Sequence, residues 1–233
     1  LPVAPARLIA ASEPVQRQLS ESGAVSEDAV CMVRPGVRCA QSPKCFDVPD
    51  RKPSVVVGGP MERPAPAEAV LRTLAELRDR QYGCACLVVG TGSAMGAIRR
   101  RAVELSLMRD LTFAEGHECD RFAELVRAGD IYISAATSRA LDVRCLQAMA
   151  AGCAVMTPES PASDFVVDGK TALCFEQESM ADLTVKLASL LDDRAAARAL
   201  AGRALEYVSG RHSVAAAASE TARVYRSVLA NSD

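Results

Sequence analysis

The sequence predicts an α/β protein built on a doubly wound parallel sheet. Short runs rich in valine, isoleucine and alanine alternate with amphipathic segments of helical length along most of the chain. The 233 residues are 49% hydrophobic and 24% charged, which suffices for one α/β core with an appendage. Strands that alternate with helices are typical of parallel sheets that helices cover on both faces.

The first predicted elements form a short βαβ unit. Residues 7–12 and 29–33 predict strands, because they are short and mostly apolar. Residues 13–22 between them predict a helix. Ser12 is its expected cap, and Pro14 lies in the first turn, where proline is tolerated.

A longer series of strands and helices follows. The predicted strands are short apolar runs at residues 54–58, 84–89, 111–114, 130–134, 153–156 and 172–175. The predicted helices are residues 67–81, 98–107, 119–127, 141–151, 180–191, 194–209 and 214–229. Val70, Leu74 and Leu77 share one face of the first of these helices, as expected of a helix that covers a sheet. Gly152 ends the predicted helix at residues 141–151, and Asp193 caps the predicted helix at residues 194–209.

Charge and hydropathy exclude several classes of protein. A net charge of −2 and an isoelectric point near 5.8 provide no basic field for nucleic acid. No run approaches the 18 or so apolar residues of a membrane span, and the first residues do not form a signal peptide. We therefore expect neither a nucleic-acid partner nor a transmembrane segment.

The nine cysteines are an odd number scattered through predicted strands and helices. This distribution favours reduced, buried thiols and a cytoplasmic location. Cys84 and Cys86 share one face of a strand, but the chain has only His117 and His212 to complete a zinc site. We therefore expect no metal site.

The stretch from Asp130 to Gly169 carries the most specific pattern. After the strand Asp130-Ile-Tyr-Ile-Ser134 come Gln147-Ala-Met-Ala-Ala-Gly152-Cys-Ala-Val-Met156 and Asp168-Gly169-Lys-Thr-Ala172. A turn that follows a parallel strand and opens a helix presents backbone amides that attract phosphate. The order and spacing of these words resemble the donor-nucleotide-sugar half of GT-B glycosyltransferases, in the large retaining family 4 group.

The resemblance implies a Rossmann-like domain that binds a nucleotide-diphosphate sugar for retaining glycosyl transfer, with no metal or other cofactor. It divides the chain into the end of an N-terminal domain (1–37), a linker (38–53), the donor-binding domain (54–212) and a crossover helix (213–233). The acceptor domain would then be almost entirely absent, so we expect this chain alone to bind donor weakly and to transfer nothing. The start at Leu1, without an initiator methionine, indicates a piece of a longer protein.

Four segments carry the donor-binding residues that the resemblance implies, and none of these residues is assigned a catalytic role. They are Gly58, Gly59 and Arg63; Gly90 and Gly92; Ser138, Arg139, Asp142 and Gln147; and Asp164.

Several of these positions depart from the family pattern. Two family glutamates eight positions apart are Arg139 and Gln147 here. Asp142 stands at a helix start, where we expect it to cap the helix and occupy amides that would otherwise bind phosphate. Gln147 can still accept hydrogen bonds from a ribose, though without charge assistance. Nearer the start, Arg34-Pro35 replaces Pro-Asn in the family's Pro-Asn-Gly-Val.

Two hypotheses for the function remain. The first is a glycosyltransferase fragment that binds a nucleotide sugar, and the second is a non-catalytic relative that keeps the fold as an interaction or scaffold module. An unrelated nucleotide-binding α/β domain ranks lowest, because the quoted words match in order and spacing. Gly90-Thr-Gly92 alone does not predict NAD binding, because Met95 stands where the third glycine of that fingerprint belongs.

Overall fold

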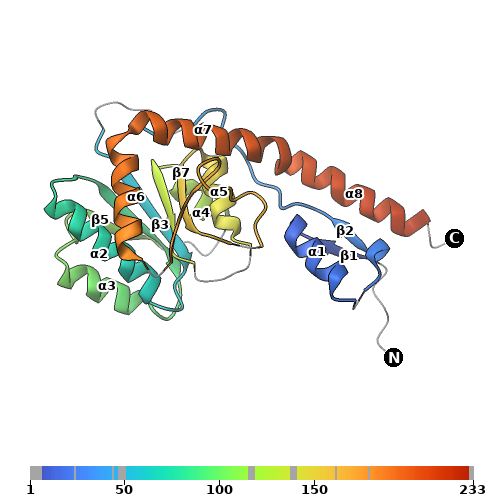
Figure 1. Cartoon of the computed structure of the whole chain (residues 1–233), viewed down its shortest axis with the longest axis horizontal. Helices are drawn as coiled ribbons and strands as arrows, with labels where there is room; N and C mark the ends of the chain where they lie inside the picture. The colour runs from blue at the N-terminus through green and yellow to red at the C-terminus, as the bar shows by residue number, and fades with distance from the viewer. Residues whose placement is uncertain are drawn as a thin grey trace.

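A parallel sheet forms the centre of the computed structural model, which describes residues 7–23, 25–43, 45–46, 51–114, 119–136, 141–160, 162–177 and 179–230 (Figure 1). Within these residues, six strands form the main sheet in the order β5-β4-β3-β6-β7-β8. Their bounds are β3 Ser54–Pro60, β4 Ala85–Thr91, β5 Leu111–Ala114, β6 Ile131–Ser134, β7 Ala154–Pro158 and β8 Leu173–Phe175. Every neighbouring pair is parallel, which confirms the predicted doubly wound sheet.

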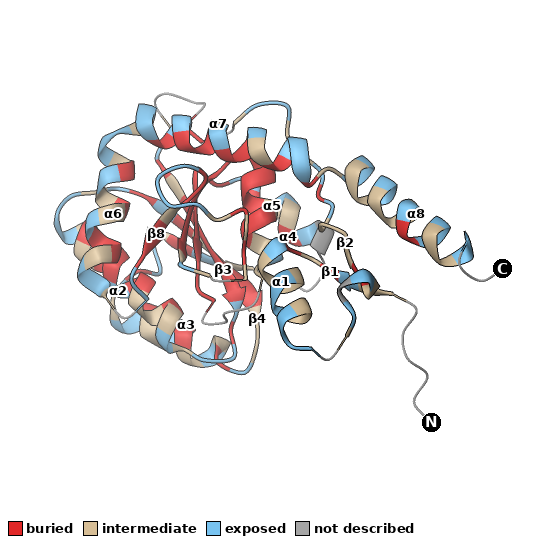
Figure 2. Ribbon diagram, turned by 45° about the vertical axis from the view of Figure 1, so that its right-hand side comes forward, coloured by how far each residue is buried: buried red, intermediate tan, exposed pale blue. Residues whose placement is uncertain are grey.

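Helices cover both faces of this sheet, and the buried residues lie between the layers (Figure 2). The helices are α2 Ala65–Asp79, α3 Met95–Glu104, α4 Cys119–Val126, α5 Val143–Ala151, α6 Met180–Asp192 and α7 Arg194–Arg211. One face packs against α2, α3 and α6, and the other against α4 and α5. Helix α7 begins beside α6 and continues along α5.

The N-terminal segment, residues 7–37, builds a separate small unit. It contains β1 Leu8–Ala10, α1 Glu13–Glu21, a 3₁₀ turn at Glu27–Ala29 and β2 Val30–Met32. Strands β1 and β2 pair in parallel with each other, apart from the main sheet. Helix α8, Val214–Ala230, projects beyond the main sheet and passes this segment (Figure 1).

The chain between β2 and β3 follows the main domain. Val37 N–H donates to His212 O at 2.7 Å, and Ala40 N–H donates to Ala150 O at 2.7 Å. Further along, Cys45 N–H donates to Gly152 O at 3.1 Å. These contacts attach residues 37, 40 and 45 to the end of α7 and to the C-terminal end of α5.

Sequence reasoning located the caps correctly. The Ser12 side chain accepts from Val15 N–H, as predicted for the start of α1. Asp193 accepts from Ala196 N–H at 2.8 Å and caps α7. Gly152, with φ 82°, ends α5 in the left-handed region that glycine favours.

The prediction that β3 ends at Gly58 and β4 at Val89 is wrong by two residues in each strand. The ladder continues through the pairs Gly59–Gly90 and Pro60–Thr91. Met61, which is fully buried, then donates from its N–H to Thr91 O at 3.1 Å. Glycine and proline normally end strands, but here the contact with Met61 keeps the two strands paired.

Helix α3 also differs from its prediction, since it spans Met95–Glu104 rather than residues 98–107. Ser106 adopts a left-handed φ of 56°, so the helix ends before Leu107.

Six of the eight cysteines whose side chains are described are buried, which confirms the expectation for these thiols: Cys45, Cys84, Cys86, Cys145, Cys153 and Cys174. Burial raises the pKa of Cys174 to about 11, so this thiol stays protonated near neutral pH. Among the described helices, none combines the length and the apolar character that crossing a bilayer requires.

Candidate functional site

The strand order places a switch point between β3 and β6. From β3 the chain continues outward through β4 and β5, and it then returns to place β6 on the other side of β3. The pairing of β3 with β6 ends at Gly58 and Ser134, and Ala135 N–H donates to Gly58 O at 2.8 Å. In open parallel sheets, ligands bind in the crevice outside the carboxyl ends of the strands at such a point.

Four of the predicted glycines gather at this edge, each in close contact with protein. A Cβ atom on Gly58 would lie 2.7 Å from Tyr132 Cε2, and one on Gly90 would lie 2.7 Å from Met61 Cγ. A Cβ on Gly59 would lie 3.2 Å from the Ala135 carbonyl carbon. Packing between strands and loops therefore accounts for glycine at these three positions without a ligand.

Gly92 has the tightest surroundings of the four. Its φ is +150°, and a Cβ atom would lie 2.3 Å from Met61 O and 2.4 Å from Met61 C. The loop after β3 and the loop after β4 are joined here, because Ala94 N–H donates to Met61 O at 2.9 Å. Arg63 follows in the same loop, exposed just before α2.

Asp142 is the N-cap of α5, as predicted. Its Oδ1 accepts from Arg144 N–H at 3.0 Å, and its Oδ2 accepts from Ser134 Oγ at 2.8 Å. The Cys145 thiol lies 3.5 Å from Oδ2, and burial followed by the Asp142 charge raises the pKa of this thiol. The chain's own carboxylate thus occupies the positive end of α5, where an anionic ligand would otherwise be attracted.

Gln147 lies one turn further along α5 and is half-buried. It lines a cavity of about 250 Å³ together with α4, the start of α8 and the end of the N-terminal segment. The other lining residues are Gly36, Val37, Arg38, Ala123, Glu124, Arg127 and Val214. Ser138 and Arg139, predicted between Asp142 and the end of β6, lie outside the described residues.

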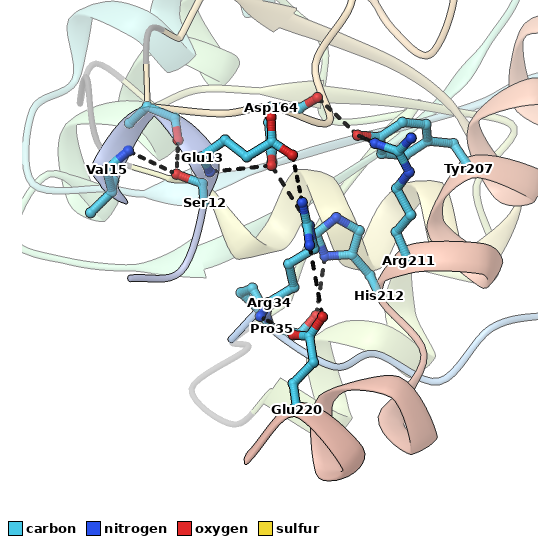
Figure 3. A network of polar contacts seen from close by, with 11 residues as sticks. Ser12, Glu13, Val15, Arg34, Pro35, Asp164, Tyr207, Arg211, His212 and Glu220 are labelled. Atoms are coloured by element: carbon cyan, nitrogen blue, oxygen red, sulfur yellow. Dashed lines mark hydrogen bonds and ion pairs between the residues drawn. The ribbon is translucent and has the colours of Figure 1, made fainter. Parts of the chain in front are cut away.

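Asp164 contacts the N-terminal segment. It follows β7, and its Oδ2 lies 3.8 Å from Arg34 Nε and 3.4 Å from the N–H of Glu13 (Figure 3). The carboxylate is therefore engaged by the N-terminal segment. The structure thus connects Gly58 to Asp142 through Ser134, places Gln147 in the cavity beside α4 and α8, and engages Asp164 with the N-terminal segment.

Sequence reasoning missed His212, which lies fully buried at the end of α7. Its Nδ1 is 3.2 Å from Pro35 O (Figure 3), so the neutral ring carries its proton on Nδ1. The ring packs against Phe165 and Tyr207. Nε2 is buried and has no hydrogen-bond partner among the described residues. A histidine at a helix end gives no sequence signal for this arrangement.

His212 is expected to make stability depend on pH. Burial lowers its pKa below 6.5, although the nearby Asp164 and Glu220 charges act in the opposite direction. The unfolded chain then binds more protons than the folded chain, so this contribution is complete above about pH 6.5 and decreases as the pH falls below that value. Urea denaturation at about pH 7.5 and about pH 5.5 should show a smaller loss of unfolding free energy in His212→Asn than in the parent. An equal loss in both proteins would contradict this role.

Comparison with known proteins identifies the architecture. The family model described as "Glycosyl transferases group 1" matches residues 52–193, a range that contains the whole six-stranded sheet. The chain belongs to the group 1 glycosyltransferases. The N-terminal segment and the whole of α7 and α8 lie outside this family match.

Two curated relatives of this group 1 glycosyltransferase chain are also glycosyltransferases. D-inositol 3-phosphate glycosyltransferase from Nocardia farcinica is 28% identical over 221 residues, covering 88% of this chain and 49% of the relative. GDP-mannose-dependent alpha-(1-6)-phosphatidylinositol monomannoside mannosyltransferase from Mycolicibacterium smegmatis is 30% identical over 146 residues, covering 58% of this chain and 38% of the relative. The chain spans half or less of the length of these relatives.

Solved structures share the fold of this group 1 glycosyltransferase chain. A glycosyltransferase from Rickettsia africae gives a TM-score of 0.76 at 19% identity, covering 96% of this chain and 63% of that one. Anabaena Alr3699/HepE, solved with UDP and glucose, gives a TM-score of 0.76 at 15% identity. The match covers 95% of this chain and 63% of that one. The C-terminal domain of the group 1 protein LpcC from Francisella tularensis gives a TM-score of 0.64 at 16% identity. The match covers 76% of this chain and 96% of that one.

Proposed function

We propose that this chain is the donor-binding half of a group 1 glycosyltransferase, which holds a nucleotide-diphosphate sugar for retaining transfer to an acceptor. The observation that carries the proposal is the switch point between β3 and β6, where α5 begins. Nucleotides bind at such points in open parallel sheets. The names of the relatives agree with this choice, because one depends on GDP-mannose and HepE was solved with UDP.

The described residues would serve different parts of such a donor. Arg63 is exposed beyond β3 and can pair with the diphosphate. Gln147 can accept from the ribose hydroxyls through its side-chain carbonyl. Asp142 opposes the diphosphate, because its carboxylate already occupies the first turn of α5. We therefore infer that donor binding to this chain is weak.

The acceptor side of the enzyme belongs to the same proposal. We assign residues 1–37 to the end of an N-terminal domain, 38–53 to a linker, 54–212 to the donor domain and 213–233 to a crossover helix. Strands β1 and β2 form a two-stranded parallel sheet, an arrangement that is marginal without further strands. Ile9 on β1 is 54% exposed, and Tyr225 and Leu229 on α8 are 68% and 70% exposed. A further acceptor-binding domain would extend this sheet and cover these side chains.

The second candidate function is a non-catalytic scaffold that keeps this fold. Two observations favour it, since Asp142 occupies the amides at the start of α5 and Asp164 is engaged by Arg34. Such a protein would no longer transfer a sugar but would still bind a partner through this fold.

Nucleotide titration separates the two functions. Calorimetry with uridine, guanosine and adenosine diphosphates should show weak binding of at least one nucleotide. Asp142→Gly removes the carboxylate from the start of α5. Glycine is itself an acceptable N-cap, so the stability cost comes mainly from the hydrogen bond that Ser134 Oγ donates to Asp142. We expect this variant to bind the same nucleotide about tenfold more tightly, because an anion no longer opposes the diphosphate.

Asp193→Gly is the matched control, because Asp193 also caps a helix through its carboxylate but begins α7, far along the chain from the predicted site. It should leave nucleotide affinity unchanged. If neither the parent nor Asp142→Gly binds any of the three nucleotides, the donor-binding proposal is wrong and the scaffold function stands.

A further inference from the structure

One arginine contacts acidic residues from three segments that are distant in the sequence (Figure 3). Arg34 follows β2, and its Nη2 lies 2.7 Å from Oε1 of Glu13 on α1. Its Nη1 lies 3.7 Å from Oε1 of Glu220 on α8, and its Nε lies 3.8 Å from Oδ2 of Asp164 after β7. We call these four residues the Arg34 cluster. The Arg34 side chain is only 17% exposed, so its contacts are partly shielded from solvent and salt.

Backbone groups reinforce the same three-way contact. Arg34 N–H donates to Glu220 Oε2 at 2.9 Å, and Ser12 Oγ donates to Ala162 O at 2.6 Å. Glu13 N–H, in the first turn of α1, faces Asp164 Oδ2 at 3.4 Å. Asp164 therefore lies at the positive end of α1, where a carboxylate is stabilised.

Apolar packing contributes little to this contact. Among the described residues 7–33, only Ala10, Ser12 and Val30 are buried, and α8 buries only Val224. The hydrophobic contribution scales with buried apolar area, and alanine and valine provide little of it. Polar contacts must therefore hold much of the N-terminal segment and α8 in place.

Arg34 supplies the positive charge that offsets the three carboxylates of the cluster. Three carboxylates surround one guanidinium, while the nearby Arg211 lies over the ring of Tyr207 at 4.8 Å. Without Arg34, the three carboxylates would repel one another in a partly buried site. A lysine could not replace it fully, because one ammonium group lacks the planar fork that reaches several partners.

We propose that Arg34 is a positioning residue that fastens the N-terminal segment and α8 to residues 162–164. It thereby sets the position of the loop after β7 relative to the rest of the candidate site. The fastening itself stands independently of the nucleotide, and only its effect on donor affinity rests on the proposed function. Asp164 accordingly serves this contact and not the sugar.

Hydrogen exchange measured by mass spectrometry on the full chain, without nucleotide, tests the proposal. In Arg34→Ala, amides of residues 8–32 and 214–230 should exchange at least about tenfold faster, because the hydrogen bond to Glu13 and the ion contacts with Glu220 and Asp164 are lost together. Amides of β3, β4, β6 and β7 should keep their rates. Glu13→Gln should affect mainly α1, and Glu220→Gln mainly α8. Arg34→Lys should fall between Arg34→Ala and the parent.

Arg17→Ala is the matched control, since Arg17 is an exposed arginine on α1 outside the cluster. It should leave exchange unchanged in both segments. Unchanged exchange in Arg34→Ala, or equal acceleration across the main sheet, would overturn the proposal. If Arg34→Ala accelerates exchange but the parent binds no nucleotide, the fastening is supported and the proposed function alone fails.

Discussion

Asp130→Ala is expected to lower the free energy of unfolding by about 3–5 kcal/mol, the range for breaking a buried ion pair from one side. The Asp130 side chain is only 1% exposed. It accepts from Phe46 N–H at 2.8 Å, from Ser54 N–H at 2.8 Å and from Arg51 Nη2 at 2.6 Å. Alanine would leave these donors, gathered where the linker meets β3 and β6, without their acceptor.

Asp110→Ala provides the control for this effect. Asp110 pairs with Lys52, the neighbour of Arg51, but its side chain is 39% exposed and that of Lys52 is 49% exposed. Exposed pairs contribute little, so the loss should be below about 1 kcal/mol. Urea denaturation followed by circular dichroism measures both variants, since the chain has no tryptophan to report fluorescence. Similar losses in the two variants would show that Asp130 does not hold this junction.

Gly92→Ala should cost about 3 kcal/mol or more of unfolding free energy. The new Cβ would lie 2.3 Å from Met61 O and 2.4 Å from Met61 C, and both obstacles are backbone atoms that cannot rotate away. The φ of +150° adds strain, because residues with a Cβ rarely adopt it. Thermal unfolding followed by circular dichroism should show a clear decrease in melting temperature.

Gly169→Ala separates strain from steric conflict. Gly169 has a φ of +68°, but a Cβ there meets no atom within 4 Å, so about 1–2 kcal/mol of unfolding free energy should be lost.

A nucleotide titration of Gly92→Ala tests whether Gly92 serves packing or ligand binding. If Gly92 only accommodates a ligand, the variant will keep its stability and lose nucleotide affinity, contrary to the packing role that we expect.

The sequence predicted the elements of the fold better than their ends. Apolar runs and helical spacing are local signals, so strands such as β6 and helices such as α2 were placed within a few residues. The extension of β3 and β4 through Gly59 and Gly90 could not be predicted, because it depends on Met61 packing between the two strands. Local propensity was overridden there by a tertiary contact.

The candidate site was predictable to the same limited extent. Asp142 was recognised as a cap because its partner, Arg144, is two residues away. Asp164 was assigned to the donor by motif position, but its contacts come from Arg34 and Glu13, at least 130 residues distant. Only the replacement of the family's proline by Arg34 could have drawn attention to that contact. His212 and Asp130 likewise depend on groups that one sequence does not bring together.

The attachment of the chain after β2 limits how the N-terminal segment can move. Val37 is paired with Ser213 in a parallel bridge, so the two passages of the chain between the units lie side by side. Beyond Val37, Ala40 and Cys45 are already bonded to the main domain. The N-terminal segment is therefore connected to the main domain through two short, hydrogen-bonded passages of chain at residues 37 and 213, and not through a flexible linker. We expect any movement of the N-terminal segment to be a rotation about residues 37 and 213, in which α8 moves together with the segment.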